Sequence, residues 1–353
     1  MSAHSARLIS ITLSVIALAL FGSVARSQPV AEPVPALTTL GTVTAHTPPP
    51  DSAPPRRLAA ADDSAAKKRK ASGKAARPAV SWEDPVREEP AGTRYQSFLS
   101  PTLQQRVSYL AYFPPGYATD SARRYPVIYW LHGLNGDQRR GAGFTAKLDV
   151  AIKAGLAPAM IVILVNGMND RFYCDSPDGK FPVETVIVKD LVAEVDRAHR
   201  TLARREARIV EGASMGGLGA LYLGFKYPEV FGVVSGVMPG IHDEHSIVEK
   251  YPKTFESVYG GSREYFIRNS PWTLVEQNAD ALRHRTFIRV WIGGADLDWR
   301  QAFTGKFHQL LDRLDLEHEY RVIPGVAHAF LPLYEKMGEA NWAFYRRALA
   351  TVK

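Results

Sequence analysis

The chain of 353 residues contains a single cysteine, which excludes a small scaffold held together by internal disulfides. Its longest hydrophobic run, residues 8–22, is shorter than the roughly 18 residues or more that span a bilayer. Aromatic residues are missing from residues 22–81. The sequence also lacks a P-loop, a G-x-G-x-x-G fingerprint and a C-x-x-C pair. We therefore expect neither a cofactor nor a metal in its chemistry.

The hydrophobic run is typical of a secretory signal peptide. Arg7 supplies a positive charge before it, and the small residues Ser23 and Ala25 follow it as in a cleavage site. Residues 1–27 are therefore predicted to be a signal peptide, and the protein is predicted to be exported to the periplasm or the extracellular space. If the signal is not cleaved, the same run would anchor the protein to a membrane.

Residues 28–81 differ in composition from the rest of the chain. Residues 28–80 include nine prolines and 13 alanines. A segment with no aromatic residue buries too little apolar surface to offset the entropy lost on ordering. We therefore predict a disordered linker at 28–81.

The positive charge is concentrated in this N-terminal part. Residues 1–80 carry ten Lys and Arg against four Asp and Glu, whereas the remaining residues carry 33 against 32. The net charge of +7 therefore belongs mostly to the signal and linker. In an exported protein the basic run from Lys67 to Lys70 favours an anionic envelope surface as partner, and no nucleic acid is expected.

Residues 82–353 contain 35 of the 36 aromatic residues and alternate short hydrophobic runs with longer amphipathic ones. The short runs predict strands at 107–113, 126–131, 160–165, 207–212, 232–237, 287–292 and 320–323. The amphipathic segments predict helices at 183–203, 217–227, 303–314 and 334–350. Such alternation indicates an α/β domain with a mostly parallel sheet and helices on both faces. We predict one catalytic domain over 82–353.

Residues 212–216 read Gly-Ala-Ser-Met-Gly, a G-x-S-x-G pattern. The pattern follows one predicted strand and opens the next predicted helix, as a nucleophile elbow requires. The sharp turn raises the Ser214 hydroxyl clear of the backbone, and the glycines allow neighbouring chain to approach. Ser214 is therefore predicted to be a nucleophile; the alternative is a glycine-rich turn whose serine has no chemical role.

A serine nucleophile needs a base, and the base needs an acid that orients it. Asp296 and His328 each follow a predicted strand, so both should lie with Ser214 at the carboxyl edge of the sheet. Their order along the chain is that of an α/β-hydrolase. We predict Asp296 as the orienting acid and His328 as the base, with Asp298 as the alternative acid.

Ester chemistry also needs hydrogen-bond donors for the oxyanion. The backbone N–H of Met215, directly after the nucleophile, is the first predicted donor. The second is the N–H of Leu134, in the loop after the strand at 126–131, where Gly133 and Gly136 permit a tight turn. His132 is expected to support this loop; the alternative is a plain turn from strand to helix.

Four segments between about residues 100 and 350 read YFPPGY, YPVIYWLHGLNG, GASMGGLGALYLGFKYPEVF and GVAHAF. They resemble the esterase D-type branch of the α/β-hydrolases, which includes feruloyl and acetyl xylan esterases, S-formylglutathione hydrolases and mycobacterial mycolyltransferases. This resemblance implies the α/β-hydrolase fold, a triad of Ser214, Asp296 and His328, and an oxyanion hole at Leu134 and Met215. Members often carry Trp two residues after the histidine, where this chain has Phe330.

Other residues carry weaker signals. Phe172 and Tyr173, in a loop after a predicted strand, join Phe330 as candidates for the substrate pocket. Residues 240–285 are expected to form a lid or surface helices. Cys174 is expected to be an inert buried residue. Residues 242–245 read His-Asp-Glu-His, which are metal-ligand types, but a solvated charged loop is favoured.

Together these features predict an exported serine esterase, of feruloyl- or acetyl-esterase type, acting on a small-molecule or glycan-linked carboxylic ester. An S-formylglutathione hydrolase is disfavoured because its thioester substrate is cytoplasmic. The alternatives are an acyltransferase of mycolyltransferase type, which moves an acyl group to a sugar hydroxyl, and a catalytically inactive envelope-binding protein. No pattern in the sequence predicts an oligomeric state.

Overall fold

The computed structural model describes residues 81–352. The predicted signal peptide and the predicted linker up to residue 80, including its basic run, lie outside the described residues. Within residues 81–352, no helix has the length and apolar character needed to cross a membrane.

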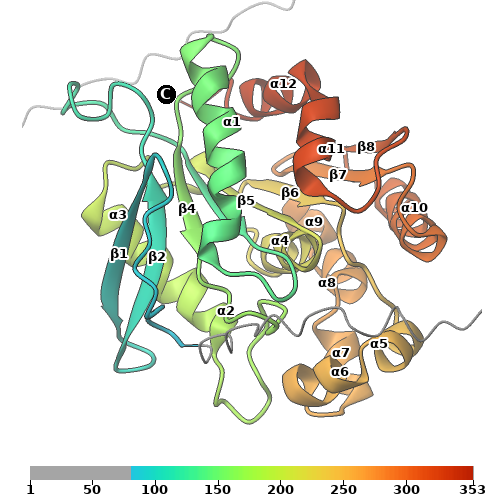
Figure 1. Cartoon of the computed structure of the whole chain (residues 1–353). Coiled ribbons are helices and arrows are strands. Elements are labelled where there is room, and N and C mark those ends of the chain that lie inside the picture. Colours follow the sequence, from blue (N-terminus) through green and yellow to red (C-terminus); the bar gives the residue numbers. More distant parts are fainter. Residues whose placement is uncertain (1–80, 353) are drawn as a thin grey trace, which may run out of the picture. The chain divides into compact units, whose positions relative to one another are not determined.

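An eight-stranded sheet forms the centre of the domain, with strand order β1-β2-β4-β3-β5-β6-β7-β8 (Figure 1). The strands are β1 (Thr93–Ser100), β2 (Gln105–Tyr112), β3 (Val127–Leu131), β4 (Ile161–Val165), β5 (Arg208–Ala213), β6 (Val233–Val237), β7 (Phe287–Gly293) and β8 (His318–Ile323). β1 pairs antiparallel with β2, and β2 with β4, whereas the other neighbouring strands are parallel. Because β4 and β5 flank β3 on opposite sides, the sheet has a topological switch point there, where open α/β sheets place their sites.

Helices cover both faces of the sheet (Figure 1). They are α1 (Ala142–Lys153), α2 (Val183–Thr185), α3 (Val192–Ala198), α4 (Met215–Lys226), α5 (Glu244–Lys250), α6 (Pro252–Tyr259), α7 (Arg263–Arg268), α8 (Pro271–Gln277), α9 (Ala279–Leu282), α10 (Asp298–Arg313), α11 (Phe330–Met337) and α12 (Glu339–Ala348). A single turn of π-helix, Val186–Leu191, joins α2 to α3.

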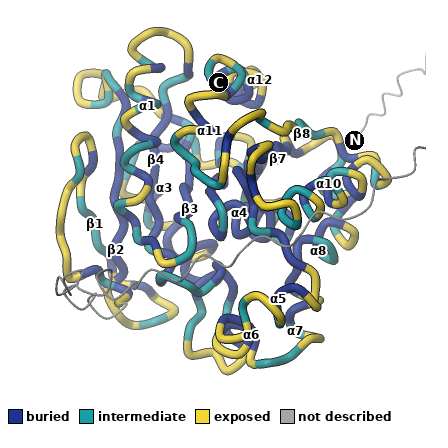
Figure 2. The backbone as a smooth tube through the Cα atoms, turned by 45° about the vertical axis from the view of Figure 1, so that its right-hand side comes forward, coloured by how far each residue is buried: buried dark blue, intermediate teal, exposed yellow. Residues whose placement is uncertain are grey.

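The two faces have separate hydrophobic cores. Successive residues of a strand point to opposite faces, so Trp130 of β3 packs with residues of α1, α11 and α12, whereas Tyr129 packs with residues of α3, α4 and α10. All five residues of β3 and of β4 are buried, as the dark blue central strands in Figure 2 show. Continuous hydrophobic strands are typical of a parallel sheet covered on both faces.

The predicted fold class is confirmed, and each of the seven predicted strands is present with its ends shifted by at most two residues. The first strand, β1, was missed because it is an edge strand with only three buried residues in eight.

The helix predicted at 183–203 ends at Ala198, since His199 is extended. The helix predicted at 334–350 is two helices, because Gly338 between them has a φ of 51°. Residues 240–285 form the five short helices α5 to α9.

Candidate active site

Ser214 lies at the turn between β5 and α4, with φ 60° and ψ −118°. A residue with a Cβ rarely adopts such a conformation, and it persists only where surrounding packing holds it. The neighbouring glycines provide that packing. A Cβ on Gly216 would lie 2.0 Å from the carbonyl oxygen of Leu131, and one on Gly212 would lie 2.4 Å from that of Gly216. The elbow is therefore packed directly against the end of β3.

His328 hydrogen bonds to both of the other predicted triad residues. Its Nε2 lies 2.8 Å from Oγ of Ser214, and its Nδ1 lies 2.6 Å from Oδ2 of Asp296. A carboxylate only accepts hydrogen bonds, so Nδ1 carries the proton that is donated to Asp296. The other nitrogen is then free to accept the proton of the serine hydroxyl. The three residues form one hydrogen-bonded chain, in which Asp296 is fully buried and His328 is partly exposed.

The remaining oxygen of Asp296 has its own donors. Oδ1 accepts from the backbone N–H of Leu297 at 2.7 Å and from Nη1 of Arg300 at 3.0 Å. Burial alone would raise the pKa of Asp296, but the hydrogen bond and charge of His328, together with these donors, lower it below its ordinary value. Asp296 is therefore held as a carboxylate. Asp298 lies exposed in the first turn of α10.

Hydrogen bonds hold the loops that carry Asp296 and His328 against each other. The N–H of Gly294 donates to the carbonyl of Ile323 at 2.7 Å, and that of Ala295 donates to the carbonyl of Val326 at 2.9 Å. A Cβ on Gly293 would lie 2.2 Å from the Val326 carbonyl oxygen, so this approach requires glycine. The separation of acid and base is thus fixed by backbone contacts.

The loop predicted to contribute the second oxyanion donor follows β3 and lies next to the elbow. A Cβ on Gly133 would be 3.4 Å from Cβ of Ser214, and Leu134 lines the same cavity as Ser214. The N–H of Met215, in the first turn of α4, is one of the donors that a helix leaves without an internal acceptor. Both predicted donors thus belong to segments that border the serine.

His132 and Tyr173 support this loop from inside the domain. Nε2 of His132 accepts from the N–H of Gly167 at 3.2 Å, and the hydroxyl of Tyr173 donates to the carbonyl of His132 at 2.8 Å. Both side chains are completely buried. The structure therefore does not bring Tyr173 into the pocket with Ser214, where the sequence suggested it. Its ring fills the space beside Gly219 of α4 and Gly167, which follows β4.

A cavity of about 220 Å³ opens beside Ser214 and His328. Its wall is largely apolar and includes Trp130, Leu134, Met238 and Phe330, with Arg140 as a cation. Phe330 thus lies where the sequence analysis expected it. Phe172 instead lines a separate small cavity with Cys174 and His242.

The weaker candidates are divided between the interior and the surface. Cys174 is buried, and burial raises the pKa of its thiol to about 12, so the thiol stays protonated and inert. His242 is buried and packs against the ring of Trp299, whereas the side chain of His245 is 82% exposed. Because they point into different surroundings, these two histidines do not form a shared site.

Arg300 was missed by the sequence reasoning. Its position four residues after Asp296, at the start of a helix, was the available signal, because residues four apart meet on a helical turn. The wall residues Trp130, Arg140 and Met238 were also missed, since each comes from a different part of the chain.

A mostly parallel sheet with a serine elbow after a central strand, and an acid and a histidine after later strands, defines an α/β-hydrolase fold. The family model described as "Putative esterase" matches residues 100–353, and the chain belongs to this family. The resemblance inferred from the sequence is thereby confirmed.

Among proteins of known sequence, a segment of 161 residues is 29% identical to an endo-1,4-beta-xylanase/feruloyl esterase of Xylanibacter ruminicola, and it covers 42% of this chain and 22% of that protein. A segment of 241 residues is 27% identical to an esterase of Mycobacterium tuberculosis, and it covers 62% of this chain and 52% of that protein. The chain therefore spans about half or less of the length of these relatives.

Solved structures share the fold. A ferulic acid esterase superimposes with a TM-score of 0.61 at 20% identity, covering 72% of this chain and 98% of that one. An S-formylglutathione hydrolase of Agrobacterium tumefaciens gives 0.58 at 19% identity, covering 73% and 95%. At these identities the similarity concerns the fold alone.

Proposed function

We propose that this protein is a serine esterase that hydrolyses carboxylic esters through an acyl-enzyme. The observation that carries the proposal is the hydrogen-bonded chain from Ser214 through His328 to Asp296, which ends at a cavity of substrate size. Such a chain is what converts a weakly nucleophilic hydroxyl into an attacking group. It argues against a catalytically inactive binding protein.

In this mechanism Ser214 Oγ attacks the ester carbonyl while Nε2 of His328 takes the hydroxyl proton. Asp296 holds the imidazole in the required tautomer and stabilises the imidazolium. The tetrahedral intermediate collapses, and His328 returns the proton to the departing alcohol. Water, activated by the same nitrogen, then releases the acid from the acyl-enzyme.

The backbone N–H groups of Leu134 and Met215 are proposed to bind the oxyanion. Removal of one such donor costs about 100- to 1,000-fold in kcat in serine hydrolases. These donors are fixed in advance here, because the Leu134 loop is held by His132 and Tyr173 and the Met215 N–H belongs to a helix. Little reorganisation is then needed when negative charge develops.

The cavity supports an ester whose acyl or alcohol part is apolar or aromatic. Trp130 and Phe330 lie with ring centroids 5.6 Å apart in its wall, and Leu134 and Met238 complete an apolar surface. An aromatic or short acyl group suits such a wall. With the feruloyl and ferulic acid esterases among the similar proteins, this favours a feruloyl- or acetyl-type ester, free or linked to a glycan.

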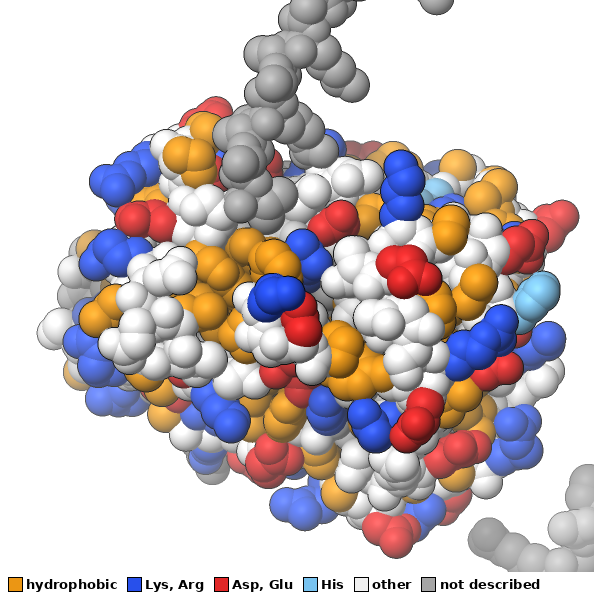
Figure 3. All heavy atoms as spheres, turned by 90° about the horizontal axis from the view of Figure 1, so that it is seen from below, with side chains coloured by type: hydrophobic (Ala, Val, Ile, Leu, Met, Phe, Trp, Pro, Cys, Tyr) orange, Lys and Arg blue, Asp and Glu red, His pale blue; other side chains and the backbone are white. Residues whose placement is uncertain are grey.

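We further propose that residues 1–27 direct export, that residues 28–81 are a linker and that residues 82–353 are the catalytic domain. The basic run of the linker would contact an anionic envelope surface. The catalytic domain is close to neutral, and the face in Figure 3 shows Lys and Arg interspersed with Asp and Glu. The face seen in this view therefore offers nucleic acid no continuous basic surface.

Labelling with a fluorophosphonate probe, alongside turnover of p-nitrophenyl acetate and methyl ferulate, tests the proposal. Ser214→Ala should abolish labelling and turnover, whereas Ser257→Ala, at an exposed serine of α6, should leave both unchanged. Labelling that persists in Ser214→Ala would refute the assignment.

A sugar acceptor added to the assay distinguishes hydrolysis from acyl transfer, because transfer yields a sugar ester in place of the free acid.

A further inference from the structure

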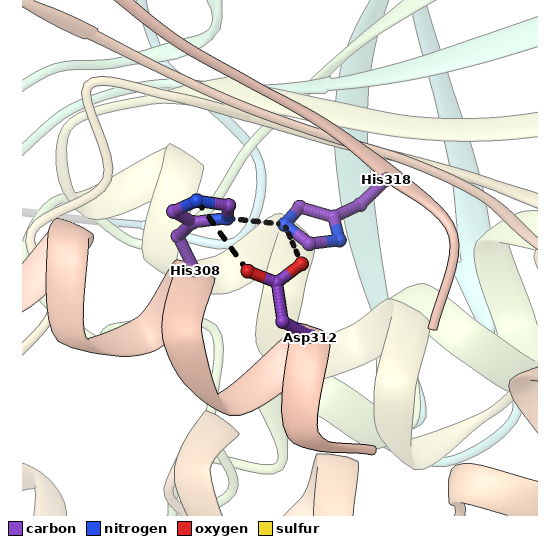
Figure 4. Close-up of side chains that lie close together, drawn as sticks. All are labelled: His308, Asp312 and His318. Atoms are coloured by element: carbon purple, nitrogen blue, oxygen red, sulfur yellow. Dashed lines mark hydrogen bonds and ion pairs between the residues drawn. The ribbon is translucent and has the colours of Figure 1, made fainter. Parts of the chain in front are cut away.

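A second cluster of reactive side chains lies on the surface between α10 and β8. His308 and Asp312 are four residues apart on α10, and His318 is the first residue of β8 (Figure 4). Among residues 81–352, these three form the one group of three or more His, Cys, Asp and Glu side chains whose ligand atoms all lie within 4.8 Å of one another. The cluster takes no part in the proposed ester chemistry.

Neighbouring groups orient both imidazole rings. Nδ1 of His318 donates to the backbone carbonyl of Leu316 at 2.7 Å, so its Nε2 carries a lone pair directed into the cluster. The His308 ring stacks on Tyr320, with centroids 4.3 Å apart and planes 10° from parallel. In metal-binding histidines, the ring nitrogen that does not bind the metal usually donates its N–H to a backbone carbonyl or a carboxylate.

The ligand atoms come from three side chains, and His308 faces its two neighbours with different ring nitrogens: its Nε2 lies 3.5 Å from Oδ2 of Asp312. Nδ1 of His308 lies 2.7 Å from Nε2 of His318, and Oδ1 of Asp312 lies 4.0 Å from the same Nε2. Because His318 Nε2 carries a lone pair, the N–H at Nδ1 of His308 donates a hydrogen bond to it, and a metal ion would take the place of that proton. The His318 side chain is 3% exposed and Asp312 60%, so the cluster opens to solvent on the carboxylate side.

We propose that His308, Asp312 and His318 bind a divalent transition-metal ion of the zinc type. Two imidazoles and one carboxylate, with an open position for water, are a common ligand set for Zn²⁺ and a poor one for Ca²⁺ or Mg²⁺, which prefer oxygen. In a tetrahedral site with Zn–N bonds of about 2.0–2.1 Å the two nitrogens lie roughly 3.3 Å apart. The rings therefore need to separate by only about 0.6 Å.

The position of the cluster assigns this metal a structural role. β8 begins at His318 and ends before the loop that carries His328, so the two histidines lie at opposite ends of a strand of about 20 Å. The metal would not reach the reacting atoms. It would instead join α10, which begins two residues after Asp296, to the strand that leads to His328.

Isothermal titration of the full, untagged, chelator-treated chain with Zn²⁺ or Co²⁺ tests this proposal. We expect one such site per chain, a rise in Tm with metal and a Co²⁺ visible absorption band typical of tetrahedral ligation. Because even outer-shell partners change metal affinity by about tenfold or more, His308→Ala and His318→Ala should each weaken binding by at least that factor. Asp312→Asn alters an exposed side chain, so it tests the site without disturbing the fold.

His245→Ala is the matched control. His245 also faces a carboxylate four residues on, Glu249, but no third ligand joins them among the described residues. The control should bind metal as the unaltered chain does. Absence of binding, or equal binding by the control and the three site variants, would overturn the proposal. Esterase activity need not respond in any variant, so failure here leaves the proposed function untouched.

Discussion

Arg300 donates a hydrogen bond to Asp296 at 3.0 Å, on the carboxylate oxygen that His328 does not use. The backbone N–H of Leu297 donates to the same oxygen. Three donors on two oxygens fix the plane of the carboxylate, and that plane sets the direction in which the imidazole points. Arg300 is therefore a positioning residue for the proposed reaction.

Replacement of Arg300 should consequently lower kcat more than it changes KM. We expect Arg300→Met to reduce kcat on p-nitrophenyl acetate by about tenfold, the equivalent of ~1.4 kcal/mol in the barrier, because the carboxylate loses one of its restraints. Arg300→Lys should recover part of this loss. Arg313→Met, at an exposed arginine at the other end of α10, is the control and should match the unaltered enzyme. An effect on KM alone would place Arg300 in substrate binding.

The two candidate acids can be separated by paired substitutions. Asp296→Asn should lower kcat by about 10⁴-fold, because an amide no longer selects the imidazole tautomer that the reaction needs. Asp298→Asn removes an equal charge two residues away at an exposed position and should change kcat little. Steady-state kinetics of both variants decides the assignment, and the reverse ranking would move the acid to Asp298.

Two glycine substitutions should have opposite effects on stability. In Gly216→Ala the new Cβ meets the Leu131 carbonyl oxygen at 2.0 Å, and backbone cannot yield as a flexible side chain can. Overpacking of this kind costs about 1–3 kcal/mol or more, with loss of the elbow geometry. Gly305→Ala, inside α10, meets only the Tyr320 hydroxyl oxygen at 3.8 Å and should stabilise by about 0.5–1 kcal/mol. Urea midpoints of the two variants measure the contrast.

Stability should fall on mild acidification because of His242. Burial, with the nearby charge of Arg300, lowers the pKa of His242 from 6.5 to about 4. The unfolded chain therefore binds this proton more readily, so folding is weakened as pH falls from about 6.5 towards 4, by up to ~3 kcal/mol. His242→Gln, which does not titrate, should flatten this part of the curve.

Denaturant unfolding at a series of pH values measures the effect. His245→Gln is the control, because its exposed side chain should contribute little to the pH dependence. A pH dependence that is the same in His242→Gln and in the unaltered chain would show that other groups cause it.

The elements that could be predicted from the sequence are those whose signal is local. β3 and β4 are short, wholly hydrophobic runs, and the elbow is a contiguous motif, so both were found. Tyr173 was wrongly predicted to line the substrate pocket because loop residues are usually exposed. In this structure its ring is buried and fills the space left by glycines. The His308, Asp312 and His318 cluster was not found, because its third member depends on how β8 returns beside α10.

The proposed catalytic assignments rest on the order of residues in the sequence and on distances in the structure. Chain order suggested Ser214, Asp296 and His328, and their distances add a second, independent support to that hypothesis. The carboxylate restraint by Arg300 was missed because the helix was predicted to begin at residue 303, whereas α10 begins at Asp298 and so places Arg300 one turn after Asp296.

β8 is one of the two edge strands of the sheet, and none of its six residues is fully buried. Edge elements with few buried contacts open at a lower free energy than a central strand such as β5. Such an opening would withdraw His328 while leaving Ser214 in its elbow. In the proposed mechanism, activity would then be lost reversibly by local opening of the last strand, without unfolding of the central sheet.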